Sequence, residues 1–169
     1  MKTKHLVLGL MLFAGLISFM SCKKTNGTST LQVKLTDAPA DYDKVNVDIR
    51  EVRVNFNDDS TGWVSLNTNA KIYNLLGLQN GVDTLLASAI VPTGTVKEIR
   101  LILGNDNTVV VAGISYPLTI PSGSESGLKL KISKTLNATL ETLIVDFDAA
   151  LSVKQETTGY KLRPVLKIE

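Results

Sequence analysis

Two aspartates at alternate positions, Asp146 and Asp148, are the first candidates for chemistry in this chain. They end an alternating apolar segment, and residues two apart on a strand project from the same face. Two such carboxylates are suited to bind Ca²⁺, or to supply one member of the carboxylate pair that hydrolyses glycosides. The simpler interpretation, which we favour, is charge pairing across strands with Lys129, Lys131 or Arg163.

A second group of carboxylates, Asp37, Asp41 and Asp43, surrounds a proline in the segment Ala38-Pro39-Ala40. Aspartate beside proline is typical of turns, so we expect this acidic loop to serve mainly as a turn. The loop also offers ligand or cation contacts if another acidic segment approaches it in the fold. We expect that the protein has no cofactor, and the one alternative that we leave open is a structural Ca²⁺ bound by such a group of carboxylates.

Aromatic rings are few, and two of them are candidates for different roles. Trp63 precedes the alternating segment Val64-Ser65-Leu66, so we expect it to be buried in the core. Tyr42 stands beside the acidic loop, and we expect it to be exposed and available for stacking against a sugar ring. The nearby loop with Asn57 and Asp59 loosely resembles an EF-hand, but Thr68 occupies the position of the required Glu, so a hairpin loop is expected.

The N-terminus has the features of an export signal. Lys2 and Lys4 precede a predominantly apolar stretch at residues 6–20, which has the length of a signal-peptide core and is short for a membrane span. Ser21 and the only cysteine, Cys22, follow, and this small residue before a cysteine resembles the lipobox of bacterial lipoproteins. We expect cleavage before Cys22 and acylation of its thiol; the alternative is an ordinary signal peptide with a leftover thiol.

Removal of that signal excludes several function classes. The only histidine, His5, is lost with it, so no histidine remains to activate a serine nucleophile. Loss of Lys2 and Lys4 leaves 16 basic and 16 acidic residues, a formal net charge of zero. Nucleic acid is therefore not an expected partner. The expected partners are the membrane, through acylated Cys22, and a glycan or an envelope protein.

The rest of the chain consists of short alternating segments. Residues 31–36, 45–49, 128–133, 143–147 and 160–168 alternate between apolar and polar side chains. One apolar face and one wet face per strand predict an antiparallel β-sandwich of the all-β class, with strands separated by Asn-, Asp- and Gly-rich turns. Residues 83–90 (DTLLASAI) are ambiguous between a helix and a strand.

The second strand contains an irregularity at Arg50-Glu51. Its apolar residues are odd-numbered up to Ile49 and even-numbered from Val52 onward, so a regular strand cannot keep both sets on one face. One extra residue at this point, a β-bulge, restores the pattern and bends the strand.

Several motifs together resemble the domain-of-unknown-function family 4382. They are LTDAP (35–39), DKVNV (43–47), EVRV (51–54), WVSL (63–66), PTGT (92–95), IRL (99–101), VDFD (145–148) and LRPVL (162–166). The resemblance covers residues 31–168 and implies an immunoglobulin- or prealbumin-like sandwich in lipoproteins of Bacteroidetes and related bacteria. The family carries no established activity, so the resemblance implies fold and location only.

These observations predict three parts: a signal peptide at 1–21, a lipidated polar tether at 22–30 and one sandwich domain at 31–169. The expected function is a non-enzymatic binding or structural module of the envelope. The alternatives are a carboxylate-dependent glycan-processing enzyme and a surface adhesin. Surface export tends to go with acidic residues after the acylated cysteine, and Lys23 and Lys24 stand there instead. We therefore expect the periplasmic face of the outer membrane.

Overall fold

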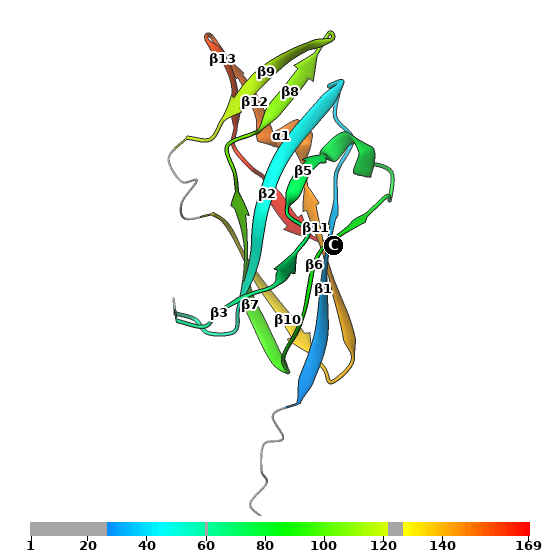
Figure 1. The fold of residues 1–169 in the computed structure, drawn as a ribbon, viewed down its shortest axis with the longest axis vertical. Helices are drawn as coiled ribbons and strands as arrows, with labels where there is room; N and C mark the ends of the chain where they lie inside the picture. The colour runs from blue at the N-terminus through cyan, green and yellow to red at the C-terminus, as the bar shows by residue number, and fades with distance from the viewer. Residues whose placement is uncertain (1–26, 60, 122–126) are drawn as a thin grey trace, which may run out of the picture.

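Two β-sheets pack face to face in the computed structural model, which describes residues 27–59, 61–121 and 127–169 (Figure 1). The alternating segments of the sequence form strands, and their apolar side chains meet between the sheets. The prediction of an all-β sandwich is therefore confirmed.

One sheet has five strands in the order β14-β11-β1-β6-β4. Its strands are β1 (Thr28–Thr36), β4 (Asn67–Thr68), β6 (Thr84–Pro92), β11 (Leu140–Phe147) and β14 (Leu166–Ile168). β1 and β11 are parallel, whereas the other neighbours in this sheet are antiparallel. Parallel neighbours need a long connection, and most of the chain lies between these two strands.

The other sheet has nine strands, seven of them in the order β10-β7-β2-β8-β9-β13-β12, while β3 and β5 pair with β2. Its strands are β2 (Lys44–Asn55), β3 (Trp63–Ser65), β5 (Lys71–Asn74), β7 (Gly94–Leu103), β8 (Thr108–Val111), β9 (Ile114–Thr119), β10 (Leu128–Leu136), β12 (Val153–Glu156) and β13 (Gly159–Leu162). The short pair β9–β13 is parallel, so both sheets are mixed.

The hydrophobic core lies between the two sheets. Its largest fully buried side chains include Leu31, Leu35, Ile49, Leu86, Ile99, Leu101, Leu143, Phe147 and Leu162. They come from central strands of both sheets, and each contributes about 1.5–3 kcal/mol by leaving water. This core holds β2, β7 and β10 in place, so that their opposite face is turned toward solvent.

The predicted bulge in β2 is confirmed. Ile49 pairs with Leu103 of β7, and Glu51 pairs with the preceding residue of β7, Ile102, so Arg50 is the extra residue. Its insertion keeps both Ile49 and Val52 in the core. The side chain of Arg50 is turned outward and is exposed.

The ambiguous segment at residues 83–90 is mainly strand. It contributes most of β6, which lies between β1 and β4 and is hydrogen-bonded to both. The described helices are a single 3₁₀ turn, η1 (Leu75–Leu78), and one α-helical turn, α1 (Ala149–Ser152). Within the described residues, no helix has the length and apolar character needed to cross a membrane.

The first strand begins at Thr28, three residues before the predicted start of the domain at 31. Strand pairing uses backbone groups, so the polar composition of this segment does not prevent it, and Thr28 pairs with Pro92. The Ser29 hydroxyl also donates a hydrogen bond of 2.8 Å to the Thr139 carbonyl. The predicted signal and Cys22 lie outside the described residues.

Candidate functional site

The parallel pairing of β1 and β11 brings two of the predicted acidic segments together. Thr36 lies opposite Asp146 in the register, and both strands point the same way. The next residue of β1, Asp37, therefore lies beside the chain that leaves β11. Asp37 accepts a hydrogen bond of 2.8 Å from the backbone N–H of Ala149.

The sequence suggested that Asp37 is a simple turn residue, but in the structure Asp37 is buried. Only 4% of it is exposed, and Gln79 donates a second hydrogen bond of 3.3 Å to its other oxygen. Burial raises the pKa of the Asp37 carboxyl to about 6, with smaller contributions from the negative charges of Asp146 and Asp148. The hydrogen bonds from Ala149 and Gln79 act in the opposite direction.

Asp146 and Asp148 do not form the pair on one strand face that the sequence predicted. Asp146 is 2% exposed, and its Oδ2 lies 2.8 Å from Nζ of Lys167, the residue opposite it on β14. Asp148 lies beyond the end of β11 and caps α1, because its Oδ1 accepts the N–H of Leu151 at 2.8 Å. The expected partners Lys129, Lys131 and Arg163 are not used.

The remaining acidic residues of the loop lie apart from this cluster. Asp41 is exposed, and Asp43 accepts a hydrogen bond of 2.8 Å from the N–H of Gly113 in the β8–β9 turn. In the part of the chain that the structure describes, no three His, Cys, Asp or Glu side chains are arranged to hold a metal ion.

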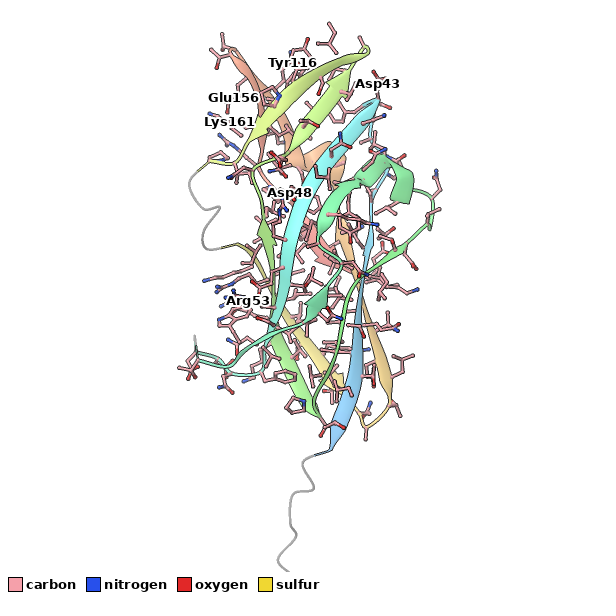
Figure 2. All side chains as sticks on the ribbon, viewed as in Figure 1. Asp43, Asp48, Arg53, Tyr116, Glu156 and Lys161 are labelled. Atoms are coloured by element: carbon pink, nitrogen blue, oxygen red, sulfur yellow. The ribbon has the colours of Figure 1, made fainter. Side chains whose placement is uncertain are left out.

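Tyr42 is half-buried instead of exposed. It packs against the core, and burial raises its pKa, with a smaller contribution from Tyr160. The rings of Tyr160 and Tyr116 lie 5.1 Å apart and line a small hollow of about 230 Å³ between β9 and β13. Figure 2 shows Tyr116, with Glu156 and Lys161, at the end of the molecule near β9 and β12.

Trp63 is not the buried core residue that the sequence predicted. It pairs with Asn55 of β2, and directly opposed residues share a face. The preceding residue, Val54, points into the core, so Asn55 and Trp63 lie on the opposite, outer face of the sheet. Its neighbour Val64 packs on the core instead. The guanidinium carbon of Arg100 lies 3.9 Å from the centre of the Trp63 ring, which is a close cation–π contact.

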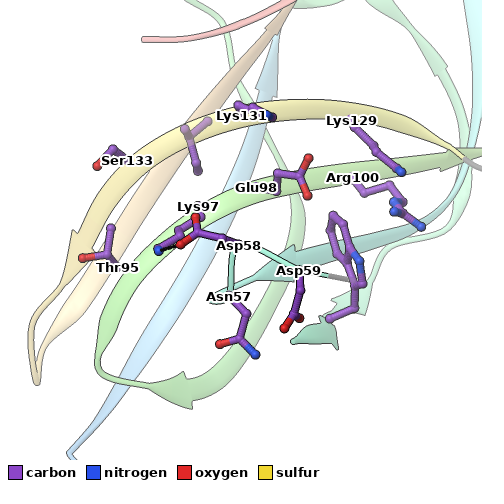
Figure 3. A pocket seen from close by; sticks show the side chains of 12 residues that line it. Asn57, Asp58, Asp59, Thr95, Lys97, Glu98, Arg100, Lys129, Lys131 and Ser133 are labelled. Atoms are coloured by element: carbon purple, nitrogen blue, oxygen red, sulfur yellow. Dashed lines mark hydrogen bonds and ion pairs between the residues drawn. The ribbon is translucent and has the colours of Figure 1, made fainter. Parts of the chain in front are cut away.

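Trp63 and Arg100 line a hollow of about 530 Å³, which we call the Trp63 groove. Strands β7 and β10 and the segment 57–59 after β2 border this groove (Figure 3). The other lining residues are Asn57, Asp58, Asp59, Thr95, Lys97, Glu98, Lys129, Lys131, Ile132 and Ser133. This size and mixture of an aromatic ring with polar groups suit a small-molecule or oligosaccharide site.

Beside the groove, Arg53 holds an ion pair with Glu51 on the same strand. Nη2 of Arg53 lies 2.6 Å from Oε2 of Glu51, and Ser65 donates a hydrogen bond of 2.6 Å to the other oxygen. These hydrogen bonds lower the pKa of Glu51, while the bond to Glu51 raises the pKa of Arg53. Figure 2 shows Asp43 just before β2, with Asp48 and Arg53 farther along that strand.

Sequence reasoning missed this groove. The alternation of Lys129 and Lys131 with apolar residues placed them correctly on a wet face, but alternation does not identify the neighbouring strand. The register that sets Lys129 beside Arg100, and Arg100 beside Arg53, arises only from the assembled sheet.

The model of one protein family, described as a domain of unknown function (DUF4382), matches residues 28–164. The matched region begins with β1 and ends two residues before β14. No curated protein and no solved structure matches the chain.

Proposed function

Since this chain belongs to the DUF4382 family, a domain of unknown function, we propose from its own residues that it is a lipid-anchored binding module of a bacterial envelope. Its role is non-enzymatic, and its ligand occupies the Trp63 groove. The observation that carries the binding role is the accessible Trp63 ring with the Arg100 guanidinium against it, in a hollow on the solvent face of the sheet.

The lipid anchor is supported by the N-terminal sequence. The basic residues Lys2 and Lys4, the apolar stretch at 6–20 and Ser21 before Cys22 are the parts of a lipoprotein signal. Acyl chains contribute about 0.8 kcal/mol per buried CH₂, so several chains on one cysteine hold a protein durably on a membrane. Cys22 is six residues from Thr28, and a chain of that length spans at most about 20 Å. The domain would therefore stay close to the lipid surface.

The resemblance to lipoproteins of Bacteroidetes and related bacteria extends this proposal to the outer membrane. Lys23 and Lys24 after the acylated cysteine favour its periplasmic face over the cell surface. A surface adhesin is the alternative if that argument about the two lysines fails.

A glycan-processing enzyme based on Asp146 or Asp148 is the competing function. Asp146 is bound to Lys167, and Asp148 caps α1, so both carboxylates have structural partners. Neither residue lines the Trp63 groove. A binding role is therefore better supported than hydrolysis by these carboxylates.

Metabolic labelling with a palmitate analogue tests the anchor. We expect label on the parent chain and none on Cys22→Ser, because the serine hydroxyl does not replace the thiol that is acylated. Ser18→Ala, a change inside the apolar stretch, is the matched control and should keep the label. Labelling of Cys22→Ser, or its absence from the parent chain, would contradict the proposed anchor.

A further inference from the structure

Three basic residues form a row at the Trp63 groove: Arg100 and Lys129 line it, and Arg53 lies next to Arg100. Arg53 of β2 lies directly opposite Arg100 of β7, and Arg100 lies directly opposite Lys129 of β10. Directly opposed residues have Cβ atoms about 4.5–5.5 Å apart and share a face, and like charges so placed repel each other. Such a row is unfavourable unless negative charge is supplied nearby.

The protein supplies only part of that negative charge. Glu51 pairs with Arg53, and Asp58 pairs with Lys97 at the groove. Among the residues that the structure describes, Arg100, Lys129 and Lys131 make no ion pair within 4.0 Å.

Two donors of the row are also unsatisfied. Nε of Arg53 and Nε of Arg100 are buried and lack a hydrogen-bond partner within the described part of the chain. A buried donor without an acceptor is costly, and the cost is larger for a charged group. Because both Nε atoms are buried, an acceptor from outside would meet Arg100 where its side chain lines the groove, and Trp63 holds the guanidinium there without accepting its hydrogen bonds.

The acidic residues of the groove leave positive charge in excess. Asp58 is paired with Lys97, and Asp59 accepts hydrogen bonds from both the N–H and the hydroxyl of Thr61. Glu98 lies opposite Lys131 in the register, without an ion pair in the described structure. Three cations without an ion pair, Arg100, Lys129 and Lys131, thus face two such carboxylates, Asp59 and Glu98, and an anionic ligand would balance the remaining positive charge.

We propose that the Trp63 groove binds an acidic oligosaccharide, whose carboxylate, sulfate or phosphate group is held by Arg100 and Lys129. This inference rests on the proposed binding role and adds the chemical class of the ligand. Guanidinium groups bind such oxyanions through paired, charge-assisted hydrogen bonds. Trp63 provides an apolar surface for a sugar ring, and Asn57, Thr95 and Ser133 provide polar groups for its hydroxyls.

The same charges disfavour a nucleic acid in this groove. Asp58, Asp59 and Glu98 line it, and they would repel a continuous row of phosphates. The predicted mature chain also has no net positive charge. A sugar chain with isolated negative groups fits this alternation of acidic and basic side chains better.

Isothermal titration of the detergent-solubilised full mature protein tests the inference. The probes are trigalacturonate for carboxylates, a chondroitin sulfate tetrasaccharide for sulfates, a mannose-6-phosphate disaccharide for phosphates, and neutral maltotetraose. We expect at least one acidic probe to bind with an affinity that falls as NaCl is raised, and maltotetraose not to bind. The acidic probe that binds identifies the source of the negative group.

Variants then locate the site. Arg100→Gln is expected to weaken the acidic probe at least tenfold, the scale of one lost charge-assisted contact, and Lys129→Gln severalfold. Lys154→Gln, an exposed lysine on β12, is the matched control and should bind as the parent does. Circular dichroism checks that each variant keeps its fold.

Three outcomes would overturn the inference. One is maltotetraose binding as tightly as the acidic probes; this result would contradict an acidic ligand but would still agree with the proposed binding role. Another is unchanged affinity in Arg100→Gln, and the third is a single-stranded oligodeoxynucleotide that binds equally well and depends equally on Arg100. Palmitate labelling reports the anchor independently of all three.

Discussion

At the scale of single residues, Asp37 has the most unusual environment of the predicted site residues. It lies at the end of β1, is almost inaccessible to water, and faces the carboxylates of Asp146 and Asp148. Its ionised form is therefore disfavoured in the folded protein, and its pKa is raised to about 6 from 3.8. The carboxyl binds the N–H of Ala149 and so joins β1 to the start of α1.

This environment predicts a pH-dependent effect of Asp37→Asn. Because the folded pKa is the higher one, the contribution of Asp37 to stability is fully present below about pH 3.8 and is lost as pH rises through about 6. Asparagine keeps an oxygen for Ala149 and does not ionise. Relative to the parent chain, Asp37→Asn should gain about 1 kcal/mol of unfolding free energy between pH 4 and pH 7, measured by urea denaturation.

Asp59→Asn provides a comparison of opposite sign. Hydrogen bonds from the Thr61 hydroxyl and N–H lower the pKa of Asp59, so its contribution to stability is present above pH 3.8 and is lost as pH falls below that value. Asp59→Asn should therefore lose stability relative to the parent at pH 7 and not at low pH. If the stability of Asp37→Asn instead changes with pH in parallel with that of the parent chain from pH 4 to 7, the result would contradict the raised pKa of Asp37.

At the scale of secondary structure, the bulge in β2 determines how the strand meets β7. The extra residue, Arg50, turns outward and places its Nη2 2.7 Å from Oδ2 of the fully buried Asp48. The backbone N–H of Gly104, after β7, donates a hydrogen bond of 2.8 Å to the Asp48 carbonyl. The chain at Gly104 passes so close to Asp48 that no side chain fits between them.

Gly104→Ala tests this close approach. A Cβ at this position would lie 1.9 Å from Oδ2 of Asp48 and 2.7 Å from Nε of Arg50. The buried Asp48 side chain would have to move and lose its contact with Arg50, so we expect a loss of about 1–3 kcal/mol in unfolding free energy.

Gly77→Ala is the matched control for that experiment, because an added Cβ there meets nothing within 4 Å. We expect it to change stability by less than about 0.5 kcal/mol. Equal stability of the Gly104→Ala and Gly77→Ala proteins in urea denaturation would show that the bulge tolerates a side chain, against the packing described.

At the scale of the whole molecule, the sandwich is elongated. The start of β1 lies at one end of the long axis, and the β8–β9 hairpin lies at the other (Figure 1). A chain anchored through Cys22 would therefore present the β8–β9 end away from the membrane. The Trp63 groove lies on β7 and β10, so this orientation would leave it open to the proposed oligosaccharide.

Protease accessibility in intact cells tests the proposed location. We expect the chain, epitope-tagged after Glu169, to resist added protease in intact cells and to be digested after lysis, because Lys23 and Lys24 favour the periplasmic face. The lysed sample controls for intrinsic resistance of the sandwich. Digestion in intact cells would refute the argument from the two lysines and support a surface adhesin.

The sequence by itself determined which face of most strands is buried. Side chains alternate on a strand, so the apolar pattern predicted the sandwich, and the change of phase between Ile49 and Val52 predicted the bulge at Arg50. Such properties depend only on neighbours along the chain. The pattern failed at Trp63, because a large apolar residue at the start of a short strand does not reveal on which face it lies.

Only the tertiary structure decided which strands are neighbours. The parallel pairing of β1 with β11 brought Asp37 to Asp146 and Asp148, and the order β10-β7-β2 aligned Arg53 with Arg100 and Lys129. Alternation specifies a face and leaves the partner strand open; the partner is selected by packing of the whole core and by the long connections that this packing stabilises. Both groups of charged residues are consequences of that selection.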